Sequence, residues 1–157
     1  MSFWLVKSEP ESFAWDDLWR TKNRTTPWEG VRNYQARNFM RDGMKPGDGV
    51  LFYHSNAKPP AIVGVAEVAR EAYPDPTAFD PASEYHDPRS SRAEPRWMMV
   101  DIRAIKPLAR PLSLEELRSE PALVRMELLR RGSRLSVQPV TAAQWKAVLR
   151  LSETGEA

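Results

Sequence analysis

The chain contains no cysteine and only two histidines among its 157 residues. Without cysteine it can form no disulfide framework, zinc–thiolate site or thiol nucleophile, and its composition fits a reducing cytoplasm. Neither His54 nor His86 stands at a metal-ligand spacing, so any metal site would need mostly carboxylates. We therefore predict neither a metal nor a cofactor.

Long hydrophobic runs and a strong net charge are also missing. The longest apolar run covers residues 61–66, far short of the ~20 residues that cross a bilayer. No export signal precedes the first strand. The net charge is only +2, because 23 basic and 21 acidic residues nearly cancel. The sequence predicts a soluble, cytoplasmic protein without a membrane partner, and it does not resemble a protein that coats DNA non-specifically.

The hydrophobic pattern predicts one α+β domain spanning residues 1–157. Strand patterns cover residues 3–6, 50–54, 62–68, 97–105 and 135–137. Helices are predicted after the caps Ser12, Ser113 and Thr141, and also over residues 33–41 and 122–131. Residues 73–95 hold five prolines and should form a long ordered surface excursion, called the flap below. Strands separated by long excursions favour a curved or barrel-like sheet over a doubly wound one.

The most informative stretch is Trp28–Arg37, with the sequence WEGVRNYQAR. It places two large aromatic side chains, two guanidinium groups and a carboxamide around one glycine. Aromatic faces can stack a nucleobase, Asn33 can read its edge, and arginines can meet phosphate. The alternative is a loop entering a helix, with Trp28 and Tyr34 packed and the arginines in solvent.

Two predicted strands end in further polar groups. Lys7, Ser8 and Glu9 follow the first strand, and His54 and Ser55 end another. The alternative for each set is an ordinary strand terminus, in which these side chains form hydrogen bonds with the nearby backbone. If the two strand ends met in one pocket, they would supply the donors and acceptors that read a base edge. No nucleophile elbow supports a Ser–His hydrolase.

These segments together resemble the EVE domain. The resemblance rests on the six stretches KSEP (7–10), WEGVRNYQAR (28–37), FYHS (52–55), GVAEV (64–68), YPDP (73–76) and LSVQPV (135–140). The resemblance covers residues 3–151. Within the EVE domain, the chain is similar to the thymocyte nuclear protein family, which is placed in the PUA-like superfamily and is related to YTH and ASCH domains. The resemblance implies a pseudo-barrel of mixed β-strands with surrounding helices, whose partner is DNA or RNA carrying modified bases.

The resemblance also implies roles for individual residues in a non-catalytic pocket for an extruded base, such as a methylated or hydroxymethylated cytosine. Trp28 and Trp97 would form stacking walls, and Ser8, Asn33 and His54 would bond the base edge. Lys7 and Arg32 would meet phosphate or a carbonyl. The rest of the predicted pocket comprises Tyr34, Ser55, Leu135, Ser136, Val137 and Pro139.

The sequence leaves open two other functions and the oligomeric state. An ASCH-like amidohydrolase or nuclease could use Lys7, Ser8 and Glu9 as base and nucleophile. A sensor of a free nucleoside or anionic metabolite would use the same pocket with little dependence on salt. The oligomeric state is uncertain, although a monomer is favoured.

Overall fold

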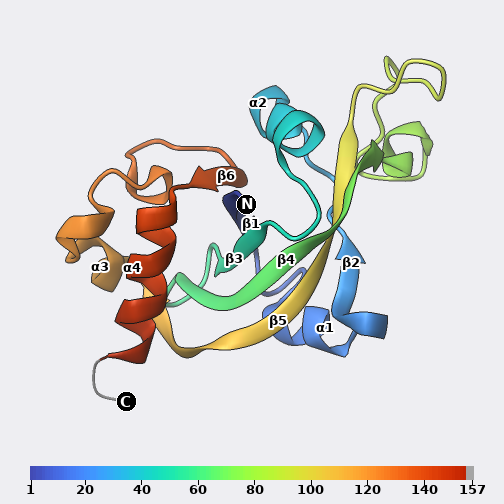
Figure 1. Ribbon diagram of the computed structural model, residues 1–157. Helices are drawn as coiled ribbons and strands as arrows, with labels where there is room; N and C mark the ends of the chain where they lie inside the picture. The colour runs from blue at the N-terminus through green and yellow to red at the C-terminus, as the bar shows by residue number, and fades with distance from the viewer. Residues whose placement is uncertain (155–157) are drawn as a thin grey trace.

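The computed structural model describes residues 1–154, and within them one mixed six-stranded sheet forms the centre of the fold (Figure 1). Its strands are β1 (Phe3–Ser8), β2 (Thr25–Pro27), β3 (Gly49–His54), β4 (Ala61–Pro74), β5 (Met98–Ser113) and β6 (Val137–Val140). They lie in the order β2-β5-β4-β3-β1-β6. The pair β1–β3 is parallel, and the other neighbours are antiparallel.

The sheet is strongly curved because its two longest strands bend together. Strands β4 and β5 pair along most of their length, with register shifts at four places. Such irregularities bend a strand and increase its twist. In Figure 1 the two strands sweep beneath the centre of the molecule and then rise to the flap. The α+β prediction is therefore confirmed.

Helices lie on both sides of this sheet. They are α1 (Trp15–Arg20), α2 (Tyr34–Asn38), α3 (Leu114–Arg118) and α4 (Ala142–Glu153), and α2 continues into a π-helical turn at Phe39–Gly43. Single 3₁₀ turns occur at Lys22–Arg24, Pro76–Phe79, Pro121–Leu123 and Glu127–Leu129. Figure 1 shows α3 and α4 together on one side, with α1 and α2 on the other. Among residues 1–154, no helix is long and apolar enough to span a membrane.

Alternating side chains on the central strands form two hydrophobic cores. On β3, Val50 and Phe52 enter the core beneath α1 and α2, whereas Leu51 and Tyr53 enter the core beneath α4. Strand β1 divides in the same way, because Trp4 and Val6 face the first core and Leu5 the second. This is the two-residue period of a strand buried on both faces. We call the first the aromatic core and the second the aliphatic core.

The predicted local elements agree with the structure in part. Thr141 and Gln144 form the predicted capping box at the start of α4, and Ser113 accepts the Glu116 N–H at the start of α3. Ser12 is not a cap, however. Helix α1 begins after Ala14, whose N–H donates to the Asp17 carboxylate at 2.7 Å.

Two further local predictions are wrong. Residues 122–131 form two short 3₁₀ turns, and the extended backbone of Met126 separates them. Met126 is buried together with Leu123 and Leu128, so tertiary packing overrides the helical pattern. The last strand begins at Val137, two residues later than predicted, because only Val137–Val140 pairs with β1.

Candidate functional site

A cavity of about 660 Å³ opens beside the aromatic core. This volume is within the range of small-molecule pockets. Four separate parts of the chain build it: the end of β1 with the turn that follows, the loop after β2, the flap and the segment before β6. Its lining comprises Lys7, Ser8, Glu9, Ser12, Phe13, Thr26, Pro27, Trp28, Glu29, Gly30, Val31, Arg32, Asn33, Glu84, Tyr85 and Ser136.

Trp28 is the best-anchored wall of the cavity. Its backbone N–H donates to the Val100 carbonyl at 2.8 Å, which ties the loop after β2 to β5. Its ring contacts Phe13 and Phe52 at centroid distances of 6.4 and 5.6 Å, both nearly perpendicular. Edge-to-face contacts hold an aromatic ring in one orientation. Trp28 is 9% exposed and also lines the cavity, so it belongs to the core and to the cavity at once.

Tyr85 brings the flap to the cavity. A Cβ atom on Gly30 would lie 2.7 Å from the Tyr85 ring, and Gly30 has a φ of +81°. Any other residue at this position would therefore meet both backbone strain and a collision. Tyr85 is 36% exposed despite its contact with Gly30, and it lines the cavity. The glycine thus allows the flap to approach the Trp28–Asn33 loop closely.

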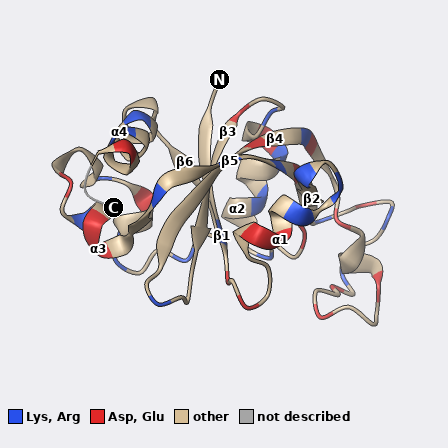
Figure 2. Ribbon diagram, turned by 90° about the horizontal axis from the view of Figure 1, so that it is seen from below, with Lys and Arg blue, Asp and Glu red and all other residues tan. Residues whose placement is uncertain are grey.

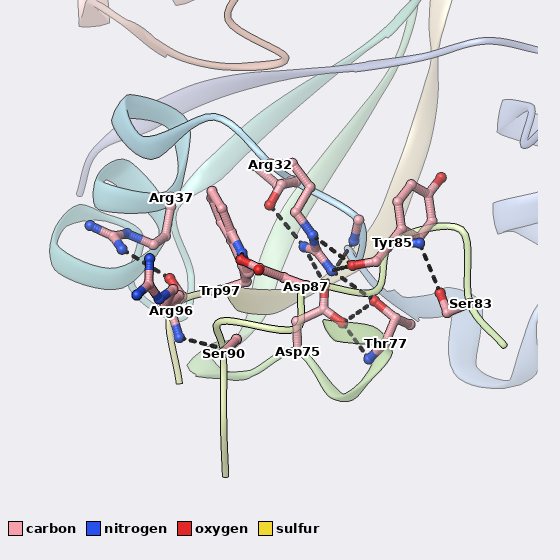
Figure 3. A network of polar contacts seen from close by, with 12 residues as sticks. Arg32, Arg37, Asp75, Thr77, Ser83, Tyr85, Asp87, Ser90, Arg96 and Trp97 are labelled. Atoms are coloured by element: carbon pink, nitrogen blue, oxygen red, sulfur yellow. Dashed lines mark hydrogen bonds and ion pairs between the residues drawn. The ribbon is translucent and has the colours of Figure 1, made fainter. Parts of the chain in front are cut away.

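Arg32 fastens the flap to the loop (Figure 3). Its guanidinium donates to the Tyr85 carbonyl at 2.8 and 3.0 Å and to the Thr77 hydroxyl at 3.1 Å. It also pairs with the buried Asp75 carboxylate at 3.1 Å, which accepts the Gly30 N–H at 2.8 Å as well. Burial alone would raise the pKa of Asp75, but its hydrogen bonds to Thr77, Gly30 and Arg32 lower it below its usual value. Arg32 therefore has a structural partner at most of its donors.

Polar groups at the end of β1 line another side of the cavity. Burial lowers the pKa of Lys7, while Glu127 opposes that shift. The Ser8 hydroxyl donates to the Phe13 carbonyl, and Ser136 lies beside them across the β1–β6 pair, where its carbonyl accepts the Lys7 N–H at 2.9 Å. These groups provide an ammonium and two hydroxyls to a ligand in the cavity.

Asn33 and Glu29 add an amide and a carboxylate to the lining. The Asn33 Oδ1 atom caps α2 by accepting the Ala36 N–H at 2.9 Å, which leaves the amide NH₂ to face a ligand. Burial and the neighbouring Asp75 raise the pKa of Glu29, while Arg32 opposes them. Donors and acceptors therefore both reach the cavity, as the hydrogen-bonding edge of a heterocycle requires.

Six of the predicted pocket residues are thus brought together: Lys7, Ser8, Trp28, Arg32, Asn33 and Ser136. Trp97 and Tyr34 lie outside the lining and stack on each other at 4.7 Å. Trp97 is 4% exposed, and its indole N–H donates to Asp87 at 2.7 Å. Figure 3 shows Trp97 beside the Asp75 and Asp87 network. This tryptophan supports the flap from beneath and is not a wall of the cavity.

The other predicted residues also lie outside the lining. His54 accepts the backbone N–H of Trp15 through Nε2 at 3.0 Å, and burial lowers its pKa. Ser55 donates its own N–H to the Ser8 carbonyl at 3.0 Å, which links the ends of β1 and β3. Leu135 and Val137 are core residues, while Pro139 is exposed on β6.

Phe13, Glu29 and Tyr85 line the cavity but were not among the predicted site residues. Glu29 belongs to the stretch that pointed to the site. Tyr85 could have been suspected as an aromatic residue within a proline-rich excursion, whereas the contact of Phe13 with Trp28 depends on tertiary folding.

Two arginines outside the cavity pair with neighbouring carboxylates. Arg41 pairs with Asp42 at 2.9 Å, and Arg130 pairs with Glu127 at 2.8 Å. Figure 2 shows acidic and basic residues interspersed on α1 and along the flap. Within residues 1–154, no group of three or more histidine, aspartate or glutamate side chains is placed to hold a metal ion.

Together, the curved mixed sheet and the helices on both of its sides define a mixed α+β domain. The chain belongs to the EVE domain family, whose sequence profile matches residues 2–151. Thymocyte nuclear protein 1 of Mus musculus is 42% identical to it over 170 residues, covering 98% of this chain and 74% of the relative.

Solved structures agree with this assignment. A hypothetical protein from Leishmania major is 49% identical and superposes with a TM-score of 0.90, covering 98% of this chain and 95% of the other. The human THYN1 protein in complex with 5-methylcytosine-containing DNA is 42% identical, with a TM-score of 0.94 and coverage of 99% and 100%. An ASCH mutant protein from Zymomonas mobilis, at 12% identity and a TM-score of 0.56, shares the fold alone.

Proposed function

We propose that this chain binds nucleic acid and reads a modified base, without breaking a bond, by holding that base in the cavity beside Trp28. The observation that carries the proposal is a cavity with anchored aromatic walls and a hydrogen-bonding lining, in a chain that shares 42% identity with a protein crystallised on 5-methylcytosine DNA. A methylated or hydroxymethylated cytosine is the preferred ligand.

Energetics favour a reader that combines stacking with contacts to a base edge. Stacking one base on an aromatic side chain contributes about 1–3 kcal/mol, and extruding it from a duplex costs a few kcal/mol. Because these contributions nearly cancel, a small additional contact decides whether the base is held. Burial of one methyl group contributes about 0.8 kcal/mol, which is enough for severalfold discrimination.

The lining of the cavity supports a revised set of proposed roles. Trp28 is the main stacking wall, and Tyr85 replaces Trp97 as the second aromatic residue at the cavity. Lys7, Asn33 and Ser136 offer donors to the base edge, and the Ser8 hydroxyl, which donates to Phe13, offers an acceptor. The role of Arg32 is to hold the flap through Asp75 and the Tyr85 carbonyl, with its remaining surface available to phosphate.

A direct titration tests this function. Fluorescent DNA and RNA strands of one sequence would carry cytosine, 5-methylcytosine, 5-hydroxymethylcytosine or N6-methyladenine. We expect tighter binding to one modified strand, and Trp28→Ala should abolish that preference. Trp19→Ala is the matched control, since Trp19 is a half-buried tryptophan outside the cavity. Equal binding of all strands by the wild-type chain would refute the proposal.

The same titration separates the two other classes of function. Affinity for a free nucleoside equal to that for a strand, with no salt dependence, would indicate a nucleoside sensor. Turnover of the strand or of an N-acylated nucleoside, lost in Lys7→Ala, would indicate an enzyme. The Ser8 hydroxyl already donates to the Phe13 carbonyl, an arrangement that does not prepare it as a nucleophile.

A further inference from the structure

The carboxylate of Glu29 differs from that of Asp75, which is buried outside the lining of the cavity. Asp75 accepts hydrogen bonds from the Gly30 N–H, from Arg32 and from Thr77. Among residues 1–154, by contrast, Glu29 makes no hydrogen bond and no ion pair, although it lines the cavity. Glu29 is exposed at this lining, so its carboxylate is accessible to a ligand in the cavity and can accept hydrogen bonds from it.

The backbone fixes the position of Glu29 from both sides. The residue before it, Trp28, donates its N–H to Val100 at 2.8 Å, and the residue after it, Gly30, donates its N–H to Asp75 at 2.8 Å. The Glu29 side chain therefore starts from a fixed point next to the stacking wall. It lies near Tyr85 as well, because its charge contributes to the raised pKa of that phenol, after burial and the effects of Glu84.

The surroundings of Glu29 disfavour a solitary negative charge. Burial and the charge of Asp75 raise its pKa, and the opposing effect of Arg32 is smaller. Arg32 itself is committed to Asp75, Thr77 and the flap. A ligand that presents an N–H group to the Glu29 carboxylate would relieve this cost.

We propose that Glu29 accepts a hydrogen bond from the exocyclic amino group of the extruded base and so selects a cytosine-type ring over thymine. The inference rests on the proposed function and adds a residue that determines specificity. 5-Methylcytosine and thymine carry the same methyl group, so neither stacking nor methyl burial separates them. They differ at position 4, where cytosine has an amino donor and thymine has a carbonyl acceptor. An ionised carboxylate only accepts, so it attracts the first and repels the second.

The test compares 5-methylcytosine with thymine in otherwise identical single strands, where no pairing partner biases extrusion. We expect the wild-type chain to prefer 5-methylcytosine by about tenfold, within the range of a specific contact between a side chain and a base edge. Glu29→Gln should reduce that preference to about twofold, because its amide can also donate to the thymine carbonyl. The thermal midpoint of Glu29→Gln should match the wild type, since the side chain has no partner to lose.

Glu11→Gln is the matched control, because Glu11 is an exposed glutamate of the turn after β1 that lies outside the lining of the cavity, and the change removes the same charge. The preference should survive in this variant. A Glu29→Gln chain that still prefers 5-methylcytosine tenfold, or a Glu11→Gln chain that loses the preference equally, would overturn the role of Glu29. In both cases wild-type binding to the modified strand would leave the proposed function intact. If the wild type bound neither strand, the proposed function and this inference would both fail.

Discussion

The two cores of the molecule differ in composition and in what covers them. The aromatic core contains Trp4, Trp15 and Trp28 and borders the cavity. The aliphatic core is built mainly from leucines such as Leu5 and Leu51, and α4 covers it through Ala147 and Val148. One sheet therefore carries a closed face and an open face.

This difference shows how a small fold separates stability from binding. Leucines interdigitate and fill space without a preferred ligand geometry, so the aliphatic core suits a structural role. Tryptophans offer large flat faces that need only two torsions to be fixed, and Phe13 and Phe52 fix Trp28. Substitutions on the two sides should accordingly affect different measurements.

The largest expected effect is on the closed face. Leu5 is fully buried in the aliphatic core, so Leu5→Ala should lower the free energy of unfolding by about 2–5 kcal/mol. Urea denaturation measures this loss. Affinity for a modified strand, measured where the variant is still folded, should remain unchanged. A large drop in affinity of the folded variant would mean that the two faces are coupled.

On the open face, Trp28→Phe should weaken binding while the chain remains folded. Phenylalanine keeps an aromatic face but loses part of the stacking area, so we expect about 1 kcal/mol less binding free energy, below the ~1–3 kcal/mol of complete removal. Fluorescence anisotropy on a 5-methylcytosine strand gives the affinity. Trp97→Phe should bind normally and lose stability through the bond to Asp87. Similar losses of affinity in both variants would restore Trp97 as a binding residue.

The flap anchor should respond to pH. The lowered pKa of Asp75 means that its ionised form stabilises the fold above its unfolded pKa of ~3.9. That contribution should be lost as the pH falls below ~4 and through the folded value. Asp75→Asn should lower the unfolding free energy at pH 7 by about 1.5 kcal/mol and should flatten the acidic part of the stability profile. An unchanged profile in the variant would assign the acid sensitivity to other carboxylates.

A small effect on stability is expected at Tyr73 on β4, whose phenol donates to Asp101 on β5. Burial, followed by the bond to Asp101 and its charge, raises the pKa of Tyr73 to about 12. Its contribution to stability is therefore complete below pH ~10 and is lost as the pH rises through about 12. Ultraviolet titration should show one tyrosine that ionises at a higher pH than the others, and this transition should be absent in Tyr73→Phe. The substitution should also lower the free energy of unfolding by about 1 kcal/mol. A high-pH transition that persists in the variant would contradict this.

The sequence predicted the parts of this molecule that depend on local pattern. Runs rich in β-forming residues located β3 and the start of β4, and the Thr141–Gln144 capping box marked the start of α4. Trp28, Asn33 and Lys7 were identified because unusual side chains gather in short segments. The resemblance to the EVE domain supplied the class of fold.

What the sequence could not predict depends on long-range contacts. Nothing local distinguishes Trp97, buried against Tyr34 and Asp87, from Trp28 at the cavity. The engagement of Arg32 with the flap joins residues more than forty positions apart along the chain, and the contact between Tyr85 and Gly30 arises in the same way. Met126 ended a helical pattern for a tertiary reason, its burial in the aliphatic core.

The central claim, that an extruded modified base occupies the cavity, is tested most directly by removing its pairing partner. Two duplexes with the same 5-methylcytosine would carry either guanine or an abasic analogue opposite it, and their affinities would be compared. If the base leaves the helix, the abasic duplex should bind roughly tenfold tighter or more, because the unpairing cost of a few kcal/mol is largely absent. Trp28→Ala should bind both duplexes weakly. Equal wild-type affinity for the two duplexes would show that the base stays stacked in the DNA, and it would contradict this account.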